Sequence, residues 1–438
     1  MEQPVSNDVS SQSGQIDETM PLVVDTQLPN GIRIATLAID PPRPSDVAVV
    51  RVRIPNGSAL DGDLPGIARF TGGMLTRGSD GRAFDDLAEE LDGLGASVSV
   101  SVGGEATDIA MMSLAEDSDR VLEIMSGMIL RPDFPQREID IVRGQMMSGL
   151  RQSRNSTRAE AERIMRQTLY PEGHPYHQRS GGTEETLAAI DRDALVTFHA
   201  HSYQASDAIV TVAGGMSHEE SVALVDRHLG QWRGETPHAH VDAATYPSAL
   251  ERRNESLAGK TQSDIAMGLP ALNRSHPDYY ALSLANLVIG RFGLMGRLGE
   301  SVRERQGMAY YTFSNLEAGL SVGLWTAHAG VAPENVDGAV ESIRREVQGF
   351  IDGGPTEREF RDSIGSILGS LPISLETSGS MAGVAADVLY YDLGNDYLRR
   401  YRSIISALTP QALQSAARDH IDPDRLVVAV VGPEESGD

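Results

Sequence analysis

Two short stretches open with the same pattern: FPQREID at residues 134–140 and GPTEREF at residues 354–360. In each stretch a proline precedes a group of charged residues, and apolar residues then recur at helical spacing. A proline in the first turn, with acidic side chains close behind it, is typical of the start of a helix. Because the two helix starts lie about half a chain length apart, the match indicates an internal duplication.

The sequence around each stretch predicts a similar series of strands and helices. In the first half, strands are predicted over 32–34, 50–54, 98–102, 110–114 and 208–213, and helices over 67–75, 84–94, 121–129, 139–150, 157–169, 184–199 and 218–229. In the second half, strands are predicted over 264–269, 308–314, 320–329 and 426–431, and helices over 279–289, 299–305, 335–351 and 356–371.

This order predicts an α+β fold with two homologous α+β halves, each a mostly antiparallel sheet covered by helices, joined by a linker. We divide the chain into a flexible polar tail (1–21), an N-terminal half (22–235), a linker (236–249) and a C-terminal half (250–438). The pattern alone leaves open a second interpretation, in which two unrelated α+β domains follow each other.

The composition excludes several classes of function. Asp and Glu number 62 against 37 Lys and Arg, and the net charge of −25 repels phosphate backbones, so no nucleic-acid partner is expected. No apolar run approaches the ~20 residues of a membrane-spanning helix, so no membrane partner is expected. The absence of cysteine excludes disulfides, thiol catalysis and thiolate metal sites. The N-terminus lacks a secretory signal, which predicts a cytoplasmic protein.

Three local patterns imitate functional motifs. Gly259-Lys260-Thr261 resembles the end of a phosphate-binding loop, but Asn254 stands where that motif needs glycine, and the stretch precedes a predicted strand. The pairs His199/His201 and His238/His240 lack a carboxylate placed to complete a metal site, so we predict solvated or capping histidines. The residues at 174–177, HPYH, are predicted to anchor a turn.

The informative stretch is GIARFTGGML at residues 66–75. It resembles the zinc-site helix of the inverzincins, the superfamily of pitrilysin, insulin-degrading enzyme and mitochondrial processing peptidase. In that family the helix carries His-x-x-Glu-His, with two zinc ligands and a glutamate that activates water. The matching positions here hold Arg69, Gly72 and Gly73, and the family's third ligand, a glutamate on a later helix, falls near Gly149. The resemblance therefore implies that this chain binds no metal and has no general base of its own.

The resemblance extends over residues 22–432. It is carried by the order of weakly specific motifs: HPY at 174–176, GGTEETL at 181–187, the segment 262–269, DYYAL at 278–282 and the segment 296–310. Within the last segment, Arg303 and Tyr310 match an arginine and a tyrosine that, in the family, face the zinc-bearing half, hold the substrate backbone and stabilise the tetrahedral intermediate. A guanidinium and a phenol are suitable donors to an oxygen that gains negative charge.

The resemblance implies a non-zinc subunit of a heterodimeric zinc metallopeptidase. Its partner would be a homologous subunit with intact His-x-x-Glu-His that supplies the zinc, and the substrates would be unfolded peptides small enough to be enclosed. The acidic composition adds the hypothesis that the chamber favours basic peptides. Three alternatives stay open: an inert scaffold or peptide-binding homologue, a peptidase with a different site, and a plain structural role in which Arg303 pairs with Glu300 or Glu304 and Tyr310 only packs.

Overall fold

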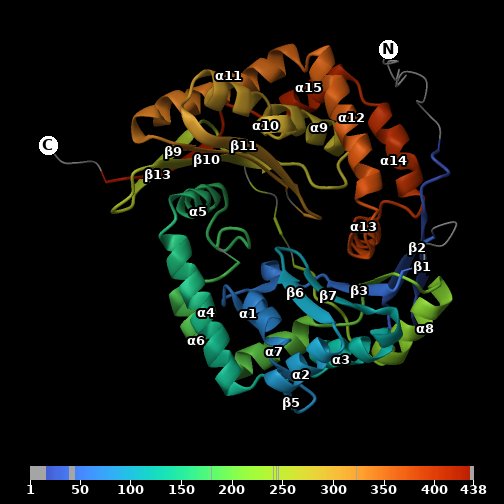
Figure 1. Cartoon of the computed structure of the whole chain (residues 1–438). Coiled ribbons are helices and arrows are strands. Elements are labelled where there is room, and N and C mark those ends of the chain that lie inside the picture. Colours follow the sequence, from blue (N-terminus) through green and yellow to red (C-terminus); the bar gives the residue numbers. More distant parts are fainter. Residues whose placement is uncertain are drawn as a thin grey trace.

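The computed structural model describes residues 16–38, 45–178, 180–239, 241, 242, 244, 246–321 and 323–434. Within these residues two sheets face each other, and their outer faces are covered by helices (Figure 1). The predicted fold of two α+β halves, each built on a mostly antiparallel sheet, is confirmed.

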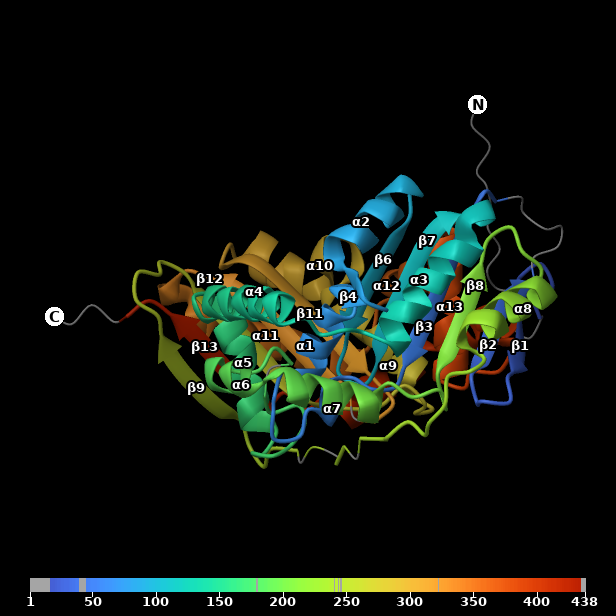
Figure 2. The same cartoon turned by 90° about the horizontal axis from the view of Figure 1, so that it is seen from below.

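The first sheet has six strands in the order β1-β2-β8-β3-β7-β6, and only the β2–β8 pair is parallel. The strands are β1 (Leu22–Gln27), β2 (Arg33–Ala38), β3 (Val47–Ile54), β6 (Ser97–Val102), β7 (Thr107–Leu114) and β8 (Ile209–Ala213). The helices of this half are α1 (Ile67–Met74), α2 (Phe84–Gly93), α3 (Ser118–Leu130), α4 (Gln136–Arg154), α5 (Thr157–Leu169), α6 (Glu184–Ala189), α7 (Arg192–Ser202) and α8 (His218–Leu229), with a short hairpin of β4 (Gly78–Ser79) and β5 (Arg82–Ala83). Seen from below, α3, α7 and α8 face the viewer (Figure 2).

The second sheet has five strands in the order β11-β12-β10-β13-β9, and only the β13–β9 pair is parallel. The strands are β9 (Glu251–Ser256), β10 (Ser263–Ala271), β11 (Ala309–Ala318), β12 (Gly323–Val331) and β13 (Val427–Gly432). The helices are α9 (Tyr279–Gly290), α10 (Phe292–Leu298), the π-helix η4 (Gly299–Arg305), α11 (Val336–Gly353), α12 (Glu357–Ile373), α13 (Ser378–Tyr390), α14 (Tyr397–Ser406) and α15 (Pro410–His420).

Each half has its own apolar core between its sheet and its outer helices. In the first half, Val52 and Ile54 of β3 and Phe70 of α1 are fully buried in one cluster. In the second half, Trp325 of β12 and Phe350 of α11 are fully buried in another. The alternation of apolar residues along the strands therefore serves two separate hydrophobic interiors, as a duplicated sequence predicts.

The halves are joined by a reciprocal exchange of helices. Helix α5, from the first half of the sequence, packs on β10 and β13 of the second sheet, whereas α13, from the second half, packs on β8, β3 and β2 of the first sheet (Figure 1). Met165 of α5 lies against Gly268 of β10, and a Cβ added to Gly268 would come within 2.6 Å of the Met165 sulfur. The two predicted halves are therefore continuous in sequence, but each sheet also packs against a helix from the other half.

Two local predictions need correction. The single helix predicted over 184–199 is two helices, because Ile190 and Asp191 are extended and the Asp191 side chain accepts the N–H of Ala194 to begin α7. Strand β9 was not predicted, because its residues, ERRNES, are charged and mostly exposed; backbone pairing with the apolar β13 alone makes them a strand.

The ends of the predicted segments are partly described. Residues 1–15 of the predicted tail lie outside the described residues, whereas the Asp17 N–H donates to the Arg399 carbonyl of α14. No helix or strand occurs among the described residues between α8 and β9, where the linker is predicted. In the part of the chain that the structure describes, no helix has both the length and the apolar character needed to cross a membrane.

Candidate functional site

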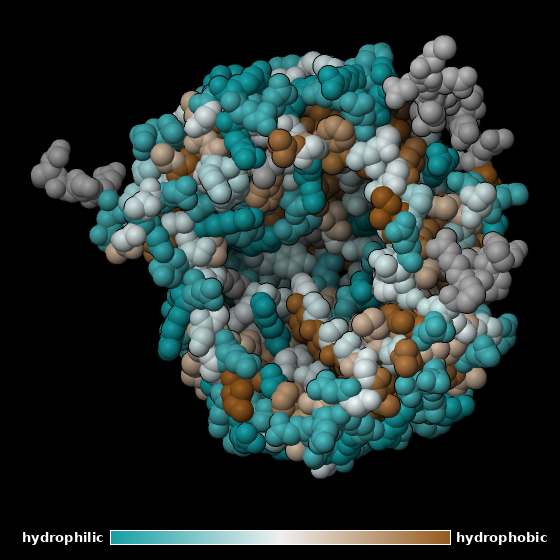
Figure 3. Space-filling view, viewed as in Figure 1, coloured by the Kyte–Doolittle hydropathy of each residue, from teal (hydrophilic) through white to brown (hydrophobic). Residues whose placement is uncertain are grey.

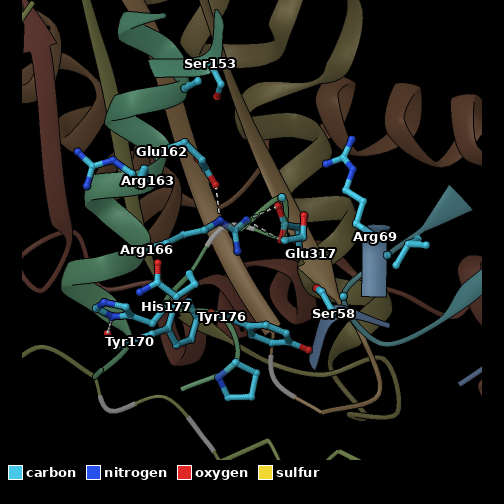
Figure 4. Close-up of a pocket in the computed structure, with 18 of the residues that line it drawn as sticks. Ser58, Arg69, Ser153, Glu162, Arg163, Arg166, Tyr170, Tyr176, His177 and Glu317 are labelled. Carbon is cyan, nitrogen blue, oxygen red and sulfur yellow. Dashed lines mark hydrogen bonds and ion pairs between the residues drawn. The ribbon is translucent and has the colours of Figure 1, made fainter. Parts of the chain in front are cut away.

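A cavity of about 1000 Å³ opens between the two halves (Figure 3). It is bounded by α1, α4, α5, the β6–β7 loop and the β11–β12 turn (Figure 4). Its charged lining residues are Arg69, Arg163, Arg166, Glu105, Glu162 and Glu317. Arginines and glutamates are equally represented, so the acidic excess of the chain does not extend to this lining, and the hypothesis of a preference for basic peptides gains no support here.

Helix α1 is held at its N-terminus by a half-buried carboxylate. The Asp61 oxygens accept the N–H groups of Gly66 (2.7 Å) and Ala68 (2.9 Å). Gly66 has φ of +100°, a conformation that suits glycine, and a Cβ there would lie 3.1 Å from the Gly181 backbone. Burial raises the pKa of Asp61 to about 6, although the two N–H donors oppose this. The start of α1 is therefore determined by one carboxylate in a crowded turn.

The four positions that match the family's zinc site lie on two adjacent helices. Arg69 of α1 and Gly149 of α4 both line the cavity, and Gly73 is exposed one turn after Arg69. Gly72 is buried instead, and a Cβ on it would come within 2.4 Å of a Val102 methyl of β6. The structure therefore brings the predicted positions together, except that the position of the general base is packed against the sheet.

These residues do not fit a zinc ion. Glycine offers no side-chain ligand, and an arginine guanidinium stays protonated and has no lone pair to donate. Val102 also occupies the space that a glutamate at position 72 would need. The chemistry of a zinc-activated water therefore has no donor set at these four positions.

The opposite wall of the cavity holds a charged cluster that links the halves. The Arg166 guanidinium of α5 donates to both Glu317 oxygens of β11 at 2.9 Å and, through Nε, to Glu162 at 2.6 Å (Figure 4). Burial opposes the charge of Arg166, but the neighbouring carboxylates outweigh this and raise its pKa. These residues were not predicted as site residues, since their meeting depends on α5 crossing to the second sheet.

Glu105 forms a second link between the halves at the cavity. Its carboxylate, in the loop between β6 and β7, accepts the N–H groups of Leu320 (2.7 Å) and Ser321 (2.9 Å) from the turn between β11 and β12. Burial, together with the nearby Glu105 charge, raises the pKa of the Tyr176 phenol, which also lines the cavity. Tyr176 belongs to the HPYH segment that the sequence predicts as a turn anchor, and His174 Nδ1 does accept its N–H at 3.0 Å.

The predicted pair Arg303 and Tyr310 lies outside this cavity. Arg303 is exposed in the last turn of η4, and Tyr310 is 78% exposed in a bulge at the start of edge strand β11. Neither lines the cavity with Arg69 and Gly149. Among the described residues Arg303 forms no ion pair, so the surface pairing with Glu300 or Glu304 is not seen there. The catalytic role of the pair stays a prediction.

The histidine pairs noted in the sequence differ in their surroundings. His199 is half-buried and its Nε2 lies 2.8 Å from the Ile129 carbonyl near the end of α3, so it is a capping residue; partial burial lowers its pKa, whereas His201 is exposed. His238 lies beside Asp207, and His240 is outside the described residues. Within the described ranges, the one group of three potential metal ligands is His276, Asp278 and His420, none of which lines the cavity.

Comparison with known proteins agrees with this geometry. Residues 37–175 match the family "Insulinase (Peptidase family M16)", and residues 189–365 match "Peptidase M16 inactive domain". The chain belongs to the M16 peptidase family. Its second match is to a domain described as inactive, and the residues that match the zinc-site positions are Arg69 and three glycines.

Relatives and solved structures cover nearly the whole chain. An uncharacterized zinc protease of Mycobacterium leprae is 26% identical over 427 residues, 94% of this chain and 92% of that protein. A non-peptidase homologue, YmxG of Helicobacter pylori, is 20% identical and covers 86% of each chain. The crystal structure of a peptidase M16 inactive domain from Pseudomonas fluorescens has a TM-score of 0.88 at 22% identity, covering 95% of this chain and 99% of that one.

Proposed function

We propose that this M16 homologue is the non-zinc subunit of a heterodimeric metallopeptidase that cleaves unfolded peptides in the cytoplasm. The partner is a homologous chain with intact His-x-x-Glu-His, which supplies the zinc and the general base. This chain supplies Arg303 and Tyr310 as hydrogen-bond donors to the peptide backbone and to the oxygen that becomes negative in the tetrahedral intermediate.

The observation that carries this proposal is the contrast between the two sets of residues. The zinc-site positions have no ligands, whereas the guanidinium of Arg303 and the phenol of Tyr310 are exposed and lie away from the chain's own cavity. Their exposure leaves both donors accessible to a second molecule, as the proposal requires. The name of one relative, a mitochondrial-processing peptidase subunit, supports a paired arrangement.

Reconstitution tests the proposal. The purified chain alone is expected to contain no stoichiometric zinc by elemental analysis and to leave a quenched-fluorescence peptide uncleaved. Co-expressed with the homologue from the same genome that has His-x-x-Glu-His, it should elute with that homologue as one complex and restore cleavage. A homologue that is fully active without this chain would overturn the proposal.

A second candidate function is an inert peptide-binding homologue, and the non-peptidase relative of H. pylori favours it. The two functions differ in one result. If this chain is inert, one outcome is that it forms no complex with the zinc-bearing homologue. The other is that a complex forms, and the double variant Arg303→Ala, Tyr310→Phe cleaves the peptide at the same rate as the wild type.

A further inference from the structure

Arg69 differs from the other charged residues of the cavity, because each of the others has a partner of opposite charge or a pair of donors. Arg166 is bound by Glu162 and Glu317, and Arg163 by Glu160 and Glu255. The Glu105 carboxylate accepts two backbone N–H groups. Among the described residues, Arg69 has neither an ion pair nor a hydrogen bond from its side chain, although it is exposed on the cavity wall.

Helix α1 places Arg69 on the cavity wall. Arg69 lies on the cavity side of α1, whereas Phe70 and Gly72 of the same helix are buried. Figure 4 shows the guanidinium apart from the Arg166–Glu317 cluster, on the other side of the view from α5. The facing position on α4 is Gly149, where nothing lies within 4 Å of an added Cβ. The site therefore has an exposed cation with open space beside it.

We propose that Arg69 turns the former zinc site into a binding site for the carboxylate of a peptide. One planar guanidinium matches one planar carboxylate through two parallel hydrogen bonds. Because the other lining charges are already paired, an anion that enters the cavity finds Arg69 as its charged partner. This inference concerns binding by the isolated chain and does not rest on the proposed peptidase function.

The remainder of the cavity suits a peptide chain better than a small ion. Its lining includes the aromatic rings of Tyr170 and Tyr176 and the apolar side chains of Met146, Leu150 and Leu324. A second cavity of about 380 Å³ shares Ala159, Glu162 and Glu317 with the first and continues along β11 to Phe313 and Asn315. Both cavities are therefore lined in part by β11, the strand that contains Tyr310.

Fluorescence anisotropy with the full-length chain tests this site. The probes are labelled, unstructured peptides of about ten residues, long enough to extend through both cavities at ~3.3 Å per residue. One probe has a free C-terminal carboxylate, one is C-terminally amidated, and two amidated probes carry an internal aspartate or its asparagine equivalent. The protein variants are Arg69→Gln, which keeps a polar side chain without the charge, and Arg137→Ala, an exposed arginine outside the cavity, as the matched control.

The wild type and Arg137→Ala should bind a carboxylate probe at least about tenfold more tightly than its neutral counterpart, and Arg69→Gln should remove that difference. Comparing the two pairs of probes shows whether the site binds a C-terminal carboxylate or a side-chain carboxylate. Competition by inorganic phosphate at the same concentration as the probe would indicate a site for small anions and would overturn the peptide assignment. No binding by the wild type, or unchanged selectivity in Arg69→Gln, would overturn the proposal altogether.

Discussion

Helix α1 and the segment from η4 to β11 hold the residues that match the two functional elements of an M16 peptidase, and they differ in what surrounds them. On α1 the Gly72 position is packed against Val102, so the space for a side chain at position 72 is filled. On η4 and β11 the side chains of Arg303 and Tyr310 are exposed. The comparison teaches that loss of zinc chemistry in one region need not involve the donors of the other.

The largest effect is expected at Tyr310. In the reconstituted complex, Tyr310→Phe should raise the activation free energy by about 2.7–4 kcal/mol and so lower kcat, because one donor to the oxyanion is lost. Steady-state kinetics with the quenched peptide measures this change. Tyr401→Phe, whose phenol lies on α14 and lines neither the cavity nor β11, is the control and should keep the wild-type rate. Equal rates for both variants would mean that the segment from η4 to β11, like helix α1, has no catalytic role.

The packing of α1 is tested by Gly72→Glu. The new side chain would meet Val102 and bring an uncompensated charge into a buried position, so the free energy of unfolding should fall by about 3 kcal/mol. Urea unfolding followed by circular dichroism measures this loss. Gly149→Glu is the matched control, because its Cβ enters open space, and its stability should change by no more than about 0.5 kcal/mol. Comparable losses in both variants would contradict the description of position 72.

The half-buried Asp61 carboxylate predicts a pH dependence. Its folded pKa of about 6 lies above the model-compound value of 3.8, so the folded state retains a proton that the unfolded state has lost between these pH values. This contribution to stability is present below about pH 4 and is lost as the pH rises through about 6. Relative to Asp61→Asn, the wild type should therefore lose about 2–3 kcal/mol of unfolding free energy between pH 4 and pH 7. Parallel stability profiles for the two proteins would contradict the shifted pKa.

The smallest effects separate the two kinds of arginine in the cavity. Arg166→Ala leaves Glu162 and Glu317 without their shared partner and should lower the free energy of unfolding by about 1–3 kcal/mol. Arg69→Ala removes a side chain without a partner among the described residues, so its stability should stay within about 0.5 kcal/mol of the wild type. Thermal and urea unfolding of both variants give the comparison, and a large loss in Arg69→Ala would show that this residue has a structural role.

Much of the fold could be predicted because the deciding information is local. The alternation in β3 and β7 and the helical spacing in α3 and α4 reflect which side chains a single element buries. Where local patterns give no such signal the prediction failed. Strand β9 has charged residues and depends on β13 for its backbone pairing, and the break at Ile190 depends on the Asp191 cap.

The sequence by itself indicated two α+β halves and showed which residues, Arg69 and three glycines, match the family's zinc-site positions, since both follow from residue types and their order along the chain. Only the tertiary structure decided that α5 and α13 cross between the halves, that Arg166 meets Glu317, and that Arg69 lines a cavity without a partner among the described residues. The physical reason is that these features depend on contacts between segments far apart in the chain, and neither helical periodicity nor motif spacing carries information about such contacts.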